Sequence, residues 1–111
     1  MIIKILLDEC LPKKLRYRIE ESDPEFFVKT VQDVGWASIV NGELLAKAEK
    51  EFDVFITSDR NLSFQQSISS SDICVFLLSA PTNVYEDLLP LVSKLATKIR
   101  THEPGKFEEI I

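Results

Sequence analysis

The stretch Phe52-Asp53-Val54-Phe55-Ile56-Thr57-Ser58-Asp59-Arg60-Asn61-Leu62 decides the fold. Its apolar, β-branched and aromatic run from Val54 to Thr57 is too short for a helix and predicts a buried strand. The small polar residues that follow end the strand and can cap a helix. Asp59 therefore stands at the carboxyl end of a buried strand, where open α/β sheets bind their ligands.

The amino terminus repeats this design. An apolar run from Ile2 to Leu7 predicts a second buried strand, and it ends at the acidic pair Asp8-Glu9. Further strands are predicted over residues 26–31, 73–78 and 106–111. Helices are predicted after Pro12, from Glu43, and over residues 88–99, where Pro90 breaks the last one locally. Strand and helix alternate throughout, which predicts one domain over residues 1–111. Its architecture should be a three-layer α/β/α fold around a mainly parallel sheet of about five strands.

Composition limits the class of protein. The 111 residues suit one domain, and no stretch is apolar for long enough to cross a bilayer. Cys10 and Cys74 lie beside or inside predicted strands, so we expect buried free thiols and a cytoplasmic location. The formal charge of −5 argues weakly against a passive nucleic-acid binder, but it does not argue against an enzyme whose acidic residues bind a metal ion.

Three acidic residues form the candidate site. Asp8 and Asp59 end strands, and Glu43 opens the helix that leads into the strand of Asp59. A crossover helix begins near the strand carboxyl ends, so the three carboxylates can converge there. Clustered carboxylates repel one another unless a proton or a cation intervenes, and oxygen ligands select Mg²⁺ or Mn²⁺. The only histidine, His102, is predicted to lie away from these strand ends. Metal-assisted chemistry on a phosphoryl group is the function that these residues favour.

Basic residues near this cluster have two interpretations. Lys13 and Arg16 are predicted to lie on the first helix, and Arg60 follows Asp59 directly. They could form a solvated surface, or they could contact the phosphates of an RNA beside the acidic cluster.

Three segments together resemble the PIN-domain superfamily, and more narrowly its small PIN-like branch related to VapC-type toxins. They are Leu6-Leu7-Asp8-Glu9-Cys10-Leu11-Pro12, Asn41-Gly42-Glu43-Leu44-Leu45 with Ala48, and Ile56-Thr57-Ser58-Asp59-Arg60-Asn61-Leu62. The resemblance runs from the first residue to the fourth predicted strand. It implies a metal-dependent endoribonuclease with Asp8, Glu43 and Asp59 as catalytic ligands of Mg²⁺ or Mn²⁺. It also implies that the chain is the toxin of a toxin–antitoxin pair. The partners would be RNA, a small antitoxin protein that contacts exposed apolar residues such as Phe64 or Val84, and a second copy of the chain.

The chain departs from the larger PIN domains in one respect. They carry a further glutamate on a helix between the first and third acids, and this chain has no clear equivalent. Glu9 and Asp33 are the candidate substitutes, and Asn61 and Asn83 are candidate auxiliary residues. An inactive PIN-like binding module is therefore one alternative.

A phosphoacceptor receiver domain is the other alternative. It shares the acidic pair after the first strand, an aspartate after the third, and a serine after the fourth, here Ser79. A receiver also needs a lysine at the end of its fifth strand. Lys106 precedes the last predicted strand instead, and this position disfavours the receiver.

Overall fold

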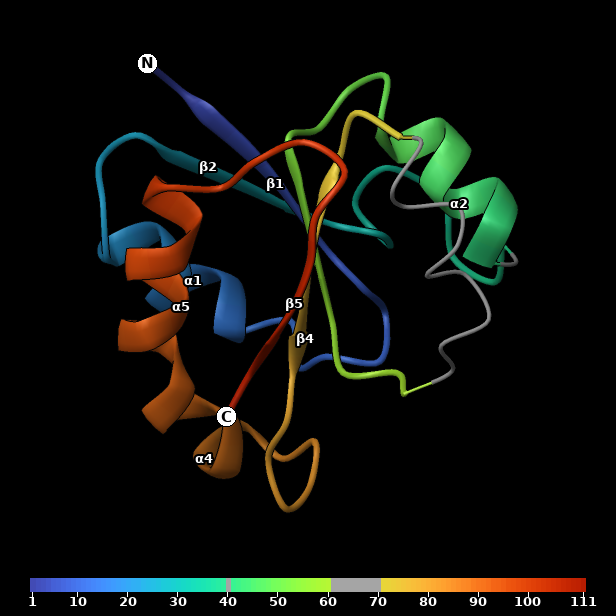
Figure 1. Ribbon diagram of the computed structural model, residues 1–111. Helices are drawn as coiled ribbons and strands as arrows, with labels where there is room; N and C mark the ends of the chain where they lie inside the picture. The colour runs from blue at the N-terminus through green and yellow to red at the C-terminus, as the bar shows by residue number, and fades with distance from the viewer. Residues whose placement is uncertain (40, 61–70) are drawn as a thin grey trace.

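The structure is a computed structural model that describes residues 1–39, 41–60 and 71–111 (Figure 1). The strands are β1 (Ile3–Leu7), β2 (Phe26–Thr30), β3 (Val54–Thr57), β4 (Cys74–Leu78) and β5 (Phe107–Ile110). The helices are α1 (Leu15–Glu21), α2 (Asn41–Ala48), α4 (Tyr85–Leu88), the 3₁₀ helix η2 (Leu89–Leu91) and α5 (Val92–Arg100).

The five strands form one parallel sheet in the order β2-β1-β3-β4-β5. The chain passes from β1 to β2 on one side and then crosses back over β1 to β3 on the other. The strand order therefore reverses between β1 and β3, and such a switch point leaves a crevice outside the strand carboxyl ends. The predicted three-layer α/β/α class is confirmed, and the sheet is wholly parallel.

Side chains alternate between the two faces of the sheet, as the pleat of a strand requires. Ile5, Leu7 and Ile56 contribute to the core beneath α1 and α5. Leu6 and Phe55 contribute to the core beneath α2. In Figure 1, α1 and α5 lie on the left of the sheet and α2 lies on the right. Both faces of the sheet are therefore covered by helices, and every residue of β3 and β4 is buried.

At Pro12 the first helix differs from its predicted extent, and at Pro90 the predicted break is present. Residues before Leu15 form turns, in which the Leu15 amide donates to the Pro12 carbonyl at 3.1 Å, so α1 begins three residues after the proline. Pro90 lies in η2, which separates α4 from α5, and this confirms the predicted local break. Within the described residues, no helix is long and apolar enough to span a membrane.

Candidate functional site at the β1–β3 switch point

The parallel ladder between β1 and β3 aligns the two strand ends that carry acidic residues. Leu7 lies opposite Ile56, and the amide of Asp8 continues the ladder by donating to the Ile56 carbonyl at 2.9 Å. Asp8 therefore lies next to Thr57, one residue beyond the regular pairing. Both residues are at the switch point, where this strand order places ligand sites.

The Asp8 carboxylate is buried and held by three donors. Its Oδ2 accepts a hydrogen bond from the Thr57 hydroxyl at 2.7 Å and another from the Cys10 thiol at 3.4 Å. Its Oδ1 accepts from the Glu9 amide at 2.8 Å. Only 8% of Asp8 is exposed, and hydrogen bonds of this kind offset the cost of burying a carboxylate. These three hydrogen bonds consequently hold the side chain in one orientation.

Thr57 connects the two aspartates and was not among the residues assigned to the site from sequence. It is fully buried, donates to Asp8, and accepts from the backbone amide of Asp59 at 3.0 Å. Its position as the last residue of a buried strand was the available signal. The sequence alone does not say that its hydroxyl meets the end of a strand 49 positions away.

Cys10 is a second residue of the site that the sequence did not predict. Its sulfur lies 3.3 Å from the Ser58 hydroxyl and 3.6 Å from the Thr57 hydroxyl. Burial raises the pKa of the Cys10 thiol, and the nearby Asp8 charge acts in the same direction, whereas the hydrogen bonds with Ser58 and Thr57 oppose it. The side chain is therefore a neutral thiol that donates to Asp8. Both Cys10 and Cys74 are free, as the sequence predicts.

Glu43 does not complete a three-carboxylate site in this structure. It lies exposed in the first turn of α2, and Asp59 lies half-buried after β3. Across the part of the chain that the structure describes, no three Asp, Glu, His or Cys side chains are grouped so that they could hold a metal ion. The structure thus brings Asp8 and the backbone of Asp59 together through Thr57 but does not add Glu43.

The auxiliary acids are occupied elsewhere. Glu9 is exposed and accepts from the Ser38 amide at 2.7 Å. Asp33 accepts from the Thr30 amide and from Arg16 Nη1 at 2.7 Å, and its own amide donates to the Thr30 hydroxyl. The backbone hydrogen bond from Thr30 is the main reason that the pKa of Asp33 lies below its usual value. Asn83 is exposed in the loop after β4, and Asn61 and Phe64 lie outside the described residues.

The three predicted phosphate contacts also differ from one another. Arg16 pairs with Asp33, and Arg60 lies 3.5 Å from Glu109 and contacts the Ser79 hydroxyl. Lys13 is exposed and takes part in no ion pair within residues 1–39, 41–60 and 71–111. Unlike Arg16 and Arg60, Lys13 could therefore bind a phosphate without breaking an ion pair.

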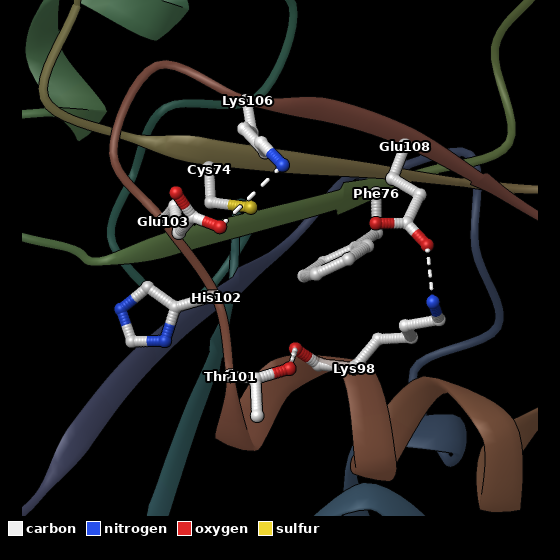
Figure 2. Close-up of a pocket in the computed structure, with 8 residues that line it drawn as sticks. All are labelled: Cys74, Phe76, Lys98, Thr101, His102, Glu103, Lys106 and Glu108. Carbon is white, nitrogen blue, oxygen red and sulfur yellow. Dashed lines mark hydrogen bonds and ion pairs between the residues drawn. The ribbon is translucent and has the colours of Figure 1, made fainter.

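A separate pocket of about 180 Å³ opens at the other end of β4 and β5 (Figure 2). Its charged side chains satisfy one another, with Lys98 2.9 Å from Glu108 and Lys106 3.4 Å from Glu103. Lys106 immediately precedes β5 and therefore lies at the opposite edge of the sheet from Asp8. This confirms that the lysine is not at the strand end that a receiver requires.

Comparisons with known proteins found no similar protein. No protein-family model, no curated protein and no solved structure matches the chain.

Proposed function

We propose that the chain is a PIN-like, metal-dependent endoribonuclease whose site lies at the β1–β3 switch point. The observation that carries the proposal is the buried Asp8 carboxylate, oriented by Thr57 at the edge where an open parallel sheet binds ligands. The three segments that resemble PIN domains supply the choice of chemistry. Asp8 and Asp59 would be the principal ligands, and Glu43 would join them only after a rearrangement.

The donor set fits a hard divalent cation that is shared with substrate. A carboxylate has about four lone-pair sites, and three donors contact Asp8, so capacity for a further contact is left. Mg²⁺ is commonly held by one or two carboxylates together with water and substrate phosphates. When bound, such an ion polarises a phosphoryl oxygen and lowers the pKa of a bound water. Lys13 would contact a neighbouring phosphate, and Thr57 would keep Asp8 oriented.

As the toxin of a toxin–antitoxin pair, the protein would need a partner that covers this edge. Val84, in the loop between β4 and α4, is 53% exposed and is the described apolar residue that we assign to such a contact.

Two other functions are each favoured by one observation. The order β2-β1-β3-β4-β5 is the flavodoxin-like order that receiver domains share. Against the receiver, Lys106 lies at the wrong edge, and Ser79 donates to Glu109. An inactive binding module is favoured by the lack of a three-acid group among the described side chains.

One experiment separates the three functions. Purified protein is incubated with structured and unstructured RNA in Mn²⁺, in EDTA, and as the Asp59→Asn variant. The nuclease should cut RNA only as wild type with Mn²⁺, whereas a receiver should be labelled at Asp59 by acetyl phosphate. Cleavage that survives both EDTA and Asp59→Asn would contradict the proposed mechanism. If the protein is neither cleaving RNA nor labelled by acetyl phosphate, the result would support the binding module.

A further inference from the structure

A second hollow, of about 360 Å³, lies against the outer part of the sheet and is not part of the switch-point site. Lys4, Phe27, Lys29 and Lys50 line it together with Glu51 and Phe52, and we call it the lysine hollow. Three cations and one anion give it a net positive charge on a chain whose formal charge is −5. Such a concentration of positive charge against the overall balance points to an anionic ligand.

The sheet register explains how the lysine hollow forms. Lys4 lies opposite Phe27, and Leu6 lies opposite Lys29, so Phe27 and Lys29 share the face that α2 covers further along the sheet. At β2 this face is left open, because α2 packs over Leu6, Phe55 and Val75, and Phe27 takes no part in that core. The buried Phe52 belongs to the same core and also lines the hollow.

The cations of the lysine hollow have no direct ion-pair partner among the described residues, although Lys29 interacts at longer range with Asp33. Lys4, Lys29 and Lys50 form no salt bridge with any other described residue. In the pocket of Figure 2, by contrast, both lysines have glutamate partners. Phe27 is 42% exposed, and the Lys29 ammonium lies 5.6 Å from its ring centroid. A partly exposed aromatic ring among cations without ion-pair partners is a combination that binds single-stranded nucleic acid, by base stacking and phosphate contact.

The lysine hollow and the switch-point site share β1, which contributes Lys4 to the hollow and ends just before Asp8. Lys4, Leu6 and Asp8 point to the same face of the sheet, with the fully buried Leu6 between the other two, and four residues of a strand span about 13 Å. We propose that the lysine hollow binds the backbone of a single-stranded RNA, with a base stacked on Phe27. This inference rests on the proposed function and specifies its substrate as single-stranded RNA.

The test is the anisotropy of a fluorescein-labelled single-stranded RNA dodecamer in EDTA, where no cleavage occurs. Lys29→Gln/Lys50→Gln is compared with Lys94→Gln/Lys98→Gln on α5, which changes the formal charge from −5 to −7 in the same way. Three phosphate contacts predict a salt slope of about −2, which is roughly an 18-fold loss of affinity between about 50 and about 200 mM salt. In Lys29→Gln/Lys50→Gln one phosphate contact is left, so the loss of affinity over the same salt range should fall to about 3-fold. The control should keep the wild-type slope.

Base stacking is tested separately. Phe27→Leu should weaken binding of the dodecamer by ~5-fold or more. It should not affect an abasic dodecamer, and the melting temperature should change little because Phe27 is 42% exposed and belongs to neither core. Equal slopes for the two double variants would overturn the proposal, as would the absence of binding at low salt. Competition by poly-glutamate equal to that by RNA, with no effect of Phe27→Leu, would indicate an acidic protein partner and overturn it too.

Failure of this inference is distinguishable from failure of the proposed function. Lysine-dependent binding without cleavage in Mn²⁺ would support the RNA surface and contradict the nuclease. Cleavage and binding that are unchanged in Lys29→Gln/Lys50→Gln would contradict only the RNA surface.

Discussion

Thr57→Val tests the network on which the candidate site depends. Valine keeps the shape of threonine at this fully buried position and removes only the hydroxyl. The change takes away the donor that lies 2.7 Å from Asp8 Oδ2 and the acceptor that lies 3.0 Å from the Asp59 amide. No cavity is created, so the loss of stability reports the hydrogen bonds.

The expected cost follows from these two contacts. A hydrogen bond to a charged group contributes about 1.5–3 kcal/mol, and a buried donor left without an acceptor costs about 1–3 kcal/mol. Because Asp59 is only half-buried, water can partly replace the lost acceptor. We therefore expect the free energy of unfolding to fall by about 2–4 kcal/mol. The remaining donors to Asp8, from Glu9 and Cys10, should keep the variant folded.

Urea unfolding measures this change. With a slope of about 2 kcal/mol per molar, the midpoint should fall by about 1–2 M while the slope stays constant. Thr57→Ser is the matched control, since it keeps the hydroxyl and should lose only the ~0.5–1.5 kcal/mol of a deleted methyl group. Thr57→Val should also cut RNA poorly in Mn²⁺, whereas Thr57→Ser should not. If the free energy of unfolding of Thr57→Val lies within about 0.5 kcal/mol of the wild-type value, the change is no larger than that of an ordinary surface substitution. The network would then not orient Asp8.

Further changes test other parts of the structure. Mn²⁺ should raise the melting temperature of the wild type, because at a 100-fold excess over Kd it adds about 2.7 kcal/mol to the free energy of unfolding. Asp59→Asn should abolish this rise in melting temperature. Asp8→Asn should abolish it as well, but it should also destabilise the metal-free protein, because an amide nitrogen cannot accept the hydrogen bonds that Asp8 receives; a fully stable metal-free variant would contradict this. The folded-state pKa of Asp33 is lowered, so its contribution is complete above the unfolded pKa and is lost as the pH falls through the folded pKa. The stability difference between wild type and Asp33→Asn should accordingly shrink below about pH 4, and a difference that is constant from neutral to acid pH would refute the assignment. Burial raises the pKa of both thiols, so a thiol reagent should modify half-buried Cys10 before buried Cys74, and both slowly until urea unfolds the chain. Leu95→Ala, in the core beneath α5, should cost about 2–5 kcal/mol in urea unfolding, with exposed Lys94→Ala as a near-neutral control.

The sequence by itself determined the layers and the strand ends of this protein. Short apolar runs from Val54 and from Ile3 encode buried strands locally, and the polar residues that follow end them, so Asp8 and Asp59 could be placed at strand ends. Periodic apolar residues encode the helices in the same local way. Their limits shifted by a few residues where prolines intervene, because turns compete with the first helical hydrogen bonds.

Only the tertiary structure decided which of these residues meet. The strand order sets β1 beside β3, and the register then places the Thr57 hydroxyl against Asp8, a contact that no local pattern contains. The same packing leaves Glu43 exposed on α2 and pairs Arg16 with Asp33. It also opens the face of β2 at Phe27, because α2 packs over the neighbouring strands instead. Contacts between distant segments depend on register and crossover, and these are set by the burial of whole surfaces rather than by any short stretch of sequence.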